Sequence, residues 1–426
     1  MTQTQTVEPA DSISSQDPHA EEKKKTKSRR PANTAFRQQR LKAWQPILTP
    51  KTVLPLFFIV GIIFAPIGGL LLYASSQVQE MSIDYTECSQ RAPLTHPNPT
   101  DPSSVREDID PKFVSSTFKN KPATSPQWGR AKDNYTWPRT GVTEPDVDVC
   151  ILSFEIPDHL EPPVLFYYRL TNFYQNHRRY VKSLDIDQLK GKARDAAAIK
   201  GGDCDPLRVG PGDKPYYPCG LIANSMFNDT FDNLTFANPQ GNQGDAPTFY
   251  NMTERGIIWS TEKELYGKSA YKPDEVLPPP NWAKQYPEDG YATVGLPDLH
   301  TWEAFQVWMR TAGLPTFSKL AMRNDKDVLK SGTYRLKIYD RFPAEQYGGR
   351  KAILISTRTV MGGRNPFLGI AYIVVGGLCI LLGVLFTGAH LVKPRKLGDH
   401  TYLSWNNDQP STATATGRAP RPGDTA

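Results

Sequence analysis

Two long apolar segments bracket this chain and constrain its fold more than any other feature. Residues 53–74 form a run of 22 without a charged side chain, and residues 367–389 form a similar run of 23. An α-helix needs about 20 apolar residues to cross a bilayer. We therefore expect membrane-spanning helices at 53–74 and 367–392, with residues 75–366 forming one large domain between them.

The segment between the two apolar runs carries the marks of a secreted domain. It holds four of the five cysteines and all four N-x-S/T sequons, at Asn134, Asn228, Asn233 and Asn251. N-glycans are carried on the surface of secreted domains, and disulfides persist in oxidising compartments. We expect residues 75–366 to be lumenal or extracellular, glycosylated and disulfide-bonded.

The charges around the first span, together with the sequons, give the orientation of the chain, whereas those around the second span alone are ambiguous. Residues 1–52 carry a net charge of +5 and residues 390–426 a net charge of +2, which leaves −1 for the region between the spans. Positive charge collects on the cytosolic side of a membrane, and no Lys or Arg follows the first span until Arg91. We expect cytosolic tails at 1–52, partly disordered, and 393–426, disordered. The loop has no basic excess, so it does not resemble a nucleic-acid-binding domain.

Four cysteines lie in the loop: Cys88, Cys150, Cys204 and Cys219. They allow three pairings. The short polar segment between Cys204 and Cys219 is rich in Gly and Pro and suits a closed loop, so we favour that bridge together with Cys88–Cys150. A closed loop of about 15 residues is worth roughly 3 kcal/mol in the chain-entropy view.

The hydropathy pattern of the loop favours short strands over helices. Period-two alternation over 333–340 and apolar, aromatic or β-branched runs at 164–170 and 352–357 predict strands. Helical spacing predicts a helix at 302–312 and a second at 171–182. The Pro-, Ser- and Thr-rich residues 92–145 predict long irregular loops. The pattern indicates a mainly-β, antiparallel β-sandwich with long loops and a few short helices.

No catalytic or cofactor motif stands out. G-x-S-x-G, H-E-x-x-H and G-x-G-x-x-G are all missing from the sequence, and the seven histidines are scattered without metal-ligand spacing. We expect no enzyme activity in this chain, no cofactor and no metal site.

Two polar segments are candidates for contact with other molecules. His177, Arg178 and Arg179 form either a solvated helix face with internal ion pairs or a docking site for acidic loops of a partner or for lipid headgroups. Residues 35–48, with Trp44, form either a short helix on the inner membrane surface or an extended strap next to the first span.

The spans carry small residues at regular spacing. Gly369, Gly376 and Gly383 repeat every seven residues in the second span, and the first span has small residues on one face, at Gly61, Ala65 and Gly68. Small residues allow helices to approach closely in lipid. We expect the face formed by Gly369, Gly376 and Gly383 to pack against a transmembrane helix of another membrane protein.

Several longer stretches resemble a known family. Residues 173–183 read FYQNHRRYVKS, residues 219–230 read CGLIANSMFNDT, and residues 306–320 read QVWMRTAGLPTFSKL. Residues 348–372 contain GGRK, ILIST and MGGRNPFLGIAY, and residues 33–50 read NTAFRQQRLKAWQPILTP. Together they resemble the cell division control protein 50 family, the glycosylated accessory β-subunits of type IV P-type ATPases, over residues 33–396. The chain lacks the additional cysteines of animal members after the first span, which suggests a fungal-type member.

The resemblance implies a specific role. It implies a β-sandwich ectodomain with two disulfides, a Cys204–Cys219 bridge and a glycan at Asn228. It also implies a 1:1 complex with the catalytic α-subunit of a type IV P-type ATPase, in which this subunit supports folding of the pump, its exit from the endoplasmic reticulum and the transport of membrane phospholipids to the cytosolic leaflet. The expected location is the endoplasmic reticulum, Golgi, endosomes or plasma membrane. No DKTGT motif is present, so ATP hydrolysis belongs to the partner.

Two other classes share the two-span topology. A ligand-gated channel subunit would need intramembrane polar residues along a pore, and the spans have almost none. A membrane-anchored lumenal hydrolase would need a nucleophile and base, for which the sequence offers no motif. Copurification from native membranes distinguishes the three classes. A large ATPase would support the accessory subunit, self-oligomers would support the channel subunit, and neither would support the hydrolase.

Overall fold

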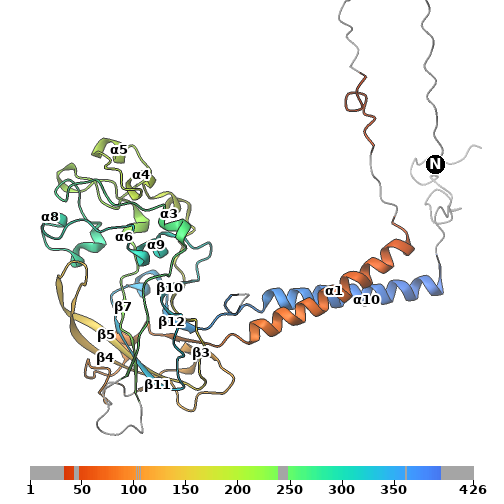
Figure 1. The fold of residues 1–426 in the computed structure, drawn as a ribbon, viewed down its shortest axis with the longest axis horizontal. Coiled ribbons are helices and arrows are strands. Elements are labelled where there is room, and N and C mark those ends of the chain that lie inside the picture. The colour runs from red at the N-terminus through yellow and green to blue at the C-terminus, as the bar shows by residue number, and fades with distance from the viewer. Residues whose placement is uncertain are drawn as a thin grey trace, which may run out of the picture. The chain divides into compact units, whose positions relative to one another are not determined.

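Two antiparallel β-sheets form the body of the region between the long helices (Figure 1). The computed structural model describes residues 33–42, 48–101, 103, 105, 107–237, 248–359 and 362–394. Residues Phe57–Phe386 form one unit, and all contacts between segments described below lie within it. The antiparallel sandwich expected from the sequence is confirmed.

The first sheet has five strands in the order β10-β6-β12-β1-β3. Their bounds are β1 (Glu80–Asp84), β3 (Val114–Thr117), β6 (Val164–Leu170), β10 (Phe317–Asn324) and β12 (Lys351–Ser356). β-Branched and aromatic residues dominate β6, and such residues suit a buried pleated surface, whereas β12 is buried along its whole length and holds the apolar run Ala352–Ile355. The strands predicted at 164–170 and 352–357 are thereby confirmed, the latter beginning and ending one residue earlier.

The second sheet has seven strands, in the order β2-β4-β5-β11-β8-β9 with β7 also pairing with β11. Their bounds are β2 (Glu107–Asp108), β4 (Gln127–Thr136), β5 (Thr143–Ile156), β7 (Thr230–Phe231), β8 (Leu234–Phe236), β9 (Thr248–Tyr250) and β11 (Gly332–Tyr339). The prediction of long irregular loops over 92–145 is wrong, because β2, β3 and β4 lie inside this segment. β4 forms in spite of the local composition because it pairs with β5, where Trp128 lies opposite Leu152 and Ala131 opposite Val149.

The sheets enclose one apolar core. Ile83 and Ile353 come from the first sheet, and Phe154, Leu336 and Ile338 from the second, all at most 1% exposed. The alternation along β11 follows from this packing, because every second side chain points into the core. A disulfide between Cys88 and Cys150 joins α2 (Cys88–Arg91) to β5 beside the core.

Short helices and loops of residues 171–316 surround a second core, rich in aromatic side chains. The helices are α3 (Arg178–Lys182), α4 (Ile186–Leu189), α5 (Ala196–Lys200), α6 (Leu221–Asn224), α7 (Ser260–Lys263), α8 (Tyr291–Val294) and α9 (Glu303–Met309). The 3-10 helices within and outside this region are η2 (Pro111–Phe113), η3 (Pro211–Asp213), η4 (Pro280–Gln285) and η5 (Ala344–Tyr347). The Trp308 indole donates to Ile222 O at 2.7 Å and that of Trp282 to Ala223 O at 3.0 Å. Two buried indoles thus bind the carbonyls of α6.

Both predicted ectodomain helices are shorter than expected. α9 ends at Met309, because the backbone becomes extended at Arg310, and the buried Nζ of Lys319 donates to three carbonyls there: those of Val307, Trp308 and Arg310, at 3.1, 2.6 and 2.6 Å. Such groups satisfy the unpaired carbonyls of a helix C-terminus. Within 171–182 only α3 is helical.

Two long helices complete the described chain: α1 (Pro50–Ser76) and α10 (Phe367–Val392). Both are long and apolar enough to cross a membrane. α1 leads into β1, and α10 follows β12. β1 and β12 pair, with Glu80 opposite Ser356. The end of α1 and the start of α10 are therefore each connected to one of two neighbouring strands of the same sheet. Within residues 57–386 the two helices lie side by side (Figure 1).

Candidate functional site

The small residues of the two spans face each other. A Cβ added to Gly376 would lie 2.9 Å from the backbone nitrogen of Ala65, and one added to Gly369 would lie 2.8 Å from that of Leu72. A Cβ on Gly383 would lie 3.2–3.3 Å from the ring of Phe58. The expectation that Gly369, Gly376 and Gly383 pack against a partner protein is wrong for this structure. Their face is covered by the first span of the same chain.

The physical reason is that the first span has its own small-residue face. A Cβ on Gly68 would meet the backbone of Ile373 and the carbonyl of Gly369, at 2.8 and 2.9 Å. Two faces without side chains approach each other closely, which is the packing that lipid favours. Phe64 stacks on Tyr372 beside this contact, with ring centroids 4.9 Å apart.

The outward surfaces of the spans remain uncovered in the described chain. Gly69 and Gly377 have no atom within 4 Å of an added Cβ. Large apolar side chains with 40% or more exposure lie around them: Ile59, Ile62, Ile63, Ile67, Leu70, Ile370, Val374, Val375, Leu378, Leu381, Val384 and Leu385. These surfaces suit contact with lipid or with another membrane protein.

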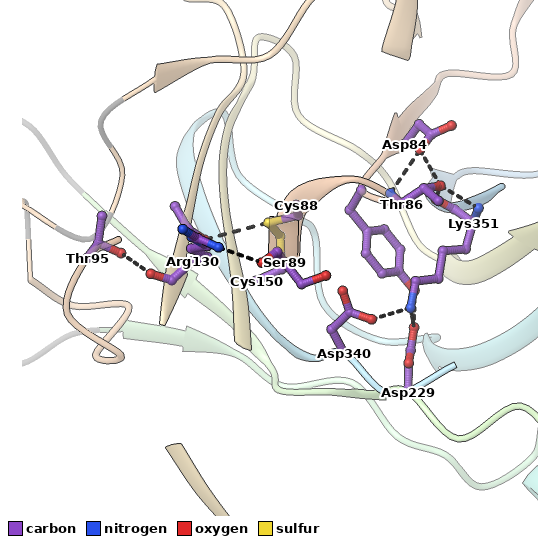
Figure 2. The surroundings of a disulfide bond; sticks show 12 residues. Asp84, Thr86, Cys88, Ser89, Thr95, Arg130, Cys150, Asp229, Asp340 and Lys351 are labelled. Atoms are coloured by element: carbon purple, nitrogen blue, oxygen red, sulfur yellow. Dashed lines mark hydrogen bonds and ion pairs between the residues drawn. A yellow bond between two sulfur atoms is a disulfide. The ribbon is translucent and has the colours of Figure 1, made fainter. Parts of the chain in front are cut away.

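A buried charged network links the two sheets of the ectodomain (Figure 2). Lys351 at the start of β12 donates to Asp229 Oδ2 at 2.8 Å and forms an ion pair with Asp340, which follows β11. Tyr85, just after β1, donates to Asp229 Oδ2 at 2.8 Å. The side chains of Lys351, Asp229 and Asp340 are at most 7% exposed. The network therefore ties β1 and β12 of one sheet to β7 and β11 of the other.

The carboxylate of Asp229 is saturated by further donors. Its Oδ1 accepts hydrogen bonds from the backbone N–H groups of Arg341 and Phe342, both at 2.6 Å. The carbonyl of Phe342 in turn accepts from Lys351 Nζ at 2.8 Å. Buried charges are tolerated when they are paired and fully hydrogen-bonded.

The electrostatics of this network favour a charged lysine. Burial alone would lower the pKa of Lys351, but Asp229 and Asp340 outweigh burial and place that pKa above its usual value. Burial, together with the neighbouring Asp229, raises the pKa of Asp340 to about 6, although Lys351 acts in the opposite direction. Burial, with help from Asp229, also raises the pKa of Tyr85. The group therefore has the character of a structural brace built around one ammonium.

A second set of contacts joins this brace to the disulfide Cys88–Cys150. Arg350 donates to Asp84 Oδ2 at 2.5 Å and to Glu87 Oε1 at 3.1 Å. Thr86 donates its hydroxyl to Asp84 Oδ1 at 2.6 Å and accepts from the backbone N–H of Lys351 at 2.8 Å. Figure 2 shows Asp84 and Thr86 next to Lys351, in the same region as the Cys88–Cys150 disulfide.

Sequence reasoning missed this network, although its members lie in conspicuous stretches. Lys351 closes the GGRK stretch, and Asp229 is the middle residue of the Asn228–Thr230 sequon. The signal was present as unusual motifs, but pairing residues more than a hundred positions apart required the fold.

The basic segment at His177–Arg179 lies at the start of α3. The side chains of His177, Arg178 and Arg179 are exposed, and among the residues that the structure describes none forms an ion pair with them. The internal ion pairs of the simpler interpretation are therefore not found within the described chain. Residues 35–39 form a turn, and Trp44 lies outside the described residues, so the choice between helix and strap stays open.

The structure places the cysteines and sequons as follows. The two disulfides are Cys88–Cys150 and Cys204–Cys219, the pairing favoured from the sequence. Asn134 and Asn251 are exposed, whereas Asn228 and Asn233 are half-buried. Asn233 Oδ1 accepts from the N–H of Met252 at 2.8 Å. Within the described ranges, no cluster of three or more His, Cys, Asp or Glu could hold a metal ion.

Comparison with known proteins covers nearly the whole chain. Residues 71–396 match the LEM3 (ligand-effect modulator 3) family / CDC50 family. The chain is 44% identical over 388 residues to the phospholipid-transporting ATPase accessory subunit CRF1 of Saccharomyces cerevisiae, covering 89% of this chain and 90% of that protein. It is 41% identical over 394 residues to the phospholipid-transporting ATPase accessory subunit CDC50 of Chaetomium thermophilum, covering 90% and 92%. It is 38% identical over 392 residues to the phospholipid-transporting ATPase accessory subunit LEM3 of Saccharomyces cerevisiae, covering 90% and 88%.

The two spans, the sandwich between them and these matches agree, and this chain belongs to the CDC50/LEM3 family.

Proposed function

We propose that this chain is the non-catalytic accessory subunit of a phospholipid-transporting type IV P-type ATPase. The observation that carries the proposal is the similarity over about nine tenths of the chain to proteins named as such subunits. The structure supports it in one respect: two adjacent apolar helices and a braced ectodomain suit a partner rather than a catalyst. In this role the chain supports folding of the pump, its exit from the endoplasmic reticulum and its transport cycle.

The proposal includes a topology. The two tails face the cytosol, and residues 75–366 face the lumen or the cell exterior, with glycans on some of Asn134, Asn228, Asn233 and Asn251. The charge bias around the first span supports this orientation. The complex then resides in the endoplasmic reticulum, Golgi, endosomes or plasma membrane.

Two surfaces are proposed to contact the ATPase, as a 1:1 complex. One is the outward surface of the paired spans, where Gly69 and Gly377 face open space. The other is the exposed basic segment of His177, Arg178 and Arg179, whose charges have no partner among the described residues and suit acidic loops. Trp44, outside the described residues, is proposed to contact the partner from the cytosolic side.

Copurification and lipid uptake test this function together. The tagged full chain is purified in mild detergent from membranes of a fungal host that lacks its own family members, and the bound proteins are identified by mass spectrometry. A P-type ATPase in near-equal amount is expected, along with restored uptake of fluorescent phospholipid into the cytosolic leaflet. Purification of the chain alone or as a self-oligomer, with no gain in uptake, would contradict the proposal.

A further inference from the structure

A hollow lined by aromatic side chains lies beside Asn228, the first residue of a sequon. It measures about 190 Å³, and its lining includes Trp137, Phe227, Tyr286 and Trp302. Asn228 also lines an adjoining hollow of about 570 Å³. A cavity of roughly 150 Å³ accommodates a six-membered ring, so the smaller hollow has room for one.

Three residues that line these hollows carry buried polar atoms without a hydrogen-bond partner; Trp137 and Asn228 line both hollows, and Arg341 lines the larger one. Among the described residues these atoms include the buried donors Trp137 Nε1 and Arg341 Nη2 and the buried acceptor Asn228 Oδ1. Arg341 contacts each of the other two: its guanidinium lies 4.6 Å from the Trp137 ring centroid, and its Nη1 donates to Asn228 O at 3.4 Å. Buried polar groups are nearly always satisfied, so these atoms call for a ligand with its own hydrogen-bonding groups.

The chemistry of the lining suits a ligand with one apolar face and several hydrogen-bond acceptors. Arg341 is already neutralised by Glu144, at 2.8 Å. The guanidinium of Arg139 lies 3.6 Å from the centroid of the Trp302 ring at the rim. A pyranose ring fits these demands: its C–H face packs on aromatic rings, and its hydroxyl and acetyl oxygens accept from indole and guanidinium donors.

The sequon itself supplies the attachment point and is held in place by the fold. Thr230 Oγ1 accepts from Arg341 Nη1 at 3.0 Å, and Asp229 belongs to the buried network with Lys351. Asn228 Oδ1 is buried without a partner, whereas Nδ2, the atom that carries an N-glycan, is not among such buried atoms. A sugar on Asn228 would therefore start from a rigid backbone at the edge of the hollow.

We propose that the first sugar of an N-glycan on Asn228 docks in this aromatic hollow and completes the packing of the ectodomain. The inference rests on the lumenal placement of residues 75–366 in the proposed function. Because the sugar is tethered to the hollow, its effective concentration is high, and weak stacking and hydrogen bonds suffice to keep it bound. Asn134 and Asn251 are exposed and line neither hollow, so glycans there stay free.

The test is the rate at which an endoglycosidase cuts between the first two sugars at each site. The full chain is produced in a eukaryotic host that makes high-mannose glycans, digested in its native state, and followed by glycopeptide mass spectrometry. We expect release at Asn228 to be at least ten-fold slower than at Asn134 and Asn251, with all three rates equal after denaturation. Equal native rates, or a glycan at Asn134 with none at Asn228, would overturn the docking.

A pair of variants separates docking from simple crowding of the enzyme. Trp137→Ala removes the ring and its donor, and release at Asn228 should then approach the rate at Asn134. Trp259→Ala is the matched control, because Trp259 is 70% exposed and lines neither hollow. An unchanged slow rate in a folded Trp137→Ala protein contradicts docking. If that variant does not fold, the native comparison between sites still decides.

Failure of the docking and failure of the proposed function give different results. A chain that carries no glycan at any of the four sequons would contradict the lumenal topology and hence both proposals. A chain glycosylated at Asn134 whose Asn228 glycan is released just as fast contradicts only the docking.

Discussion

Gly376 of α10 lies against Ala65 of α1 so closely that a Cβ on the glycine would be 2.9 Å from the alanine's backbone nitrogen. Real Cβ atoms do not approach this closely, so the two backbones would have to move apart. The glycine row of the second span is therefore the seam that joins the spans to each other. A partner in the membrane meets the pair from outside this seam.

Gly376→Leu should destabilise the span pair. Overpacking a well-packed contact costs about 1–3 kcal/mol, and here the added side chain meets backbone. Gly377→Leu is the matched control, since nothing lies within 4 Å of its added Cβ. Thermal unfolding of the purified full chain in detergent should show a Tm below that of the wild type for Gly376→Leu and an unchanged Tm for Gly377→Leu. Equal Tm values for the two variants would show that the seam does not form.

Lys351→Met should prevent stable folding of the ectodomain. Removing the ammonium leaves Asp229 and Asp340 buried without their cation, and breaking a buried ion pair in this way costs about 3–5 kcal/mol. Lys326→Met removes an exposed lysine and should have no effect. Protease resistance of the full chain in membranes measures the difference. A Lys351→Met protein as resistant as the control would refute the bracing role.

Glu303 gives the ectodomain a stability that is lost in acid. Its carboxylate accepts from the N–H of Ile257 at 2.9 Å and pairs with Lys263 at 2.5 Å. Burial raises the pKa of Glu303, but Lys263 and the N–H of Ile257 outweigh it, so the pKa lies below the usual 4.5. A depressed pKa means that this stabilisation is present above pH 4.5 and is lost as the pH falls through the folded-state pKa.

Glu303→Gln should therefore lower the stability at pH 7 by about 1–3 kcal/mol, the value of a hydrogen bond to a charged group. The gap between wild type and variant should close as the pH falls below 4.5. Glu161→Gln, at an exposed position, serves as the control with no gap at either pH. Denaturant unfolding of the full chain across this pH range measures both. A gap that stays constant down to pH 3 would argue against the ion pair.

Arg178→Glu combined with Arg179→Glu should weaken copurification of the ATPase several-fold without changing the Tm of the chain. The two exposed guanidiniums have no ion partner among the described residues, so reversing their charge costs the fold little and repels acidic loops of a partner. Lys119→Glu with Lys121→Glu makes the same charge change at another exposed place. The wild-type complex should also weaken with added salt, because exposed charge contacts are screened. Equal recovery of ATPase by both double variants would exclude this surface.

Local patterns predicted those elements whose burial is set by their own residues. The alternation of Tyr334, Leu336 and Ile338 predicted β11 because one face of that strand fills the core. β4 was missed because the sequence on either side of it is rich in Pro, Ser and Thr. The strand is stabilised by its pairing with β5, which the local composition does not reveal. α9 was predicted too long because its backbone becomes extended at Arg310, where Lys319, ten residues beyond the end of the helix, donates to its last carbonyls.

The sequence alone determined the two spans, the sandwich class, the cysteine pairing that we favoured and the family. These follow from hydropathy, spacing and motifs, which are local properties. Only the tertiary structure decided that Gly376 meets Ala65 of the same chain, and that Asp229 of a sequon binds Lys351 of the GGRK stretch. A small-residue face shows that a helix will approach closely but not which helix it meets. A charged residue likewise shows no partner until pairing of the strands brings distant positions together.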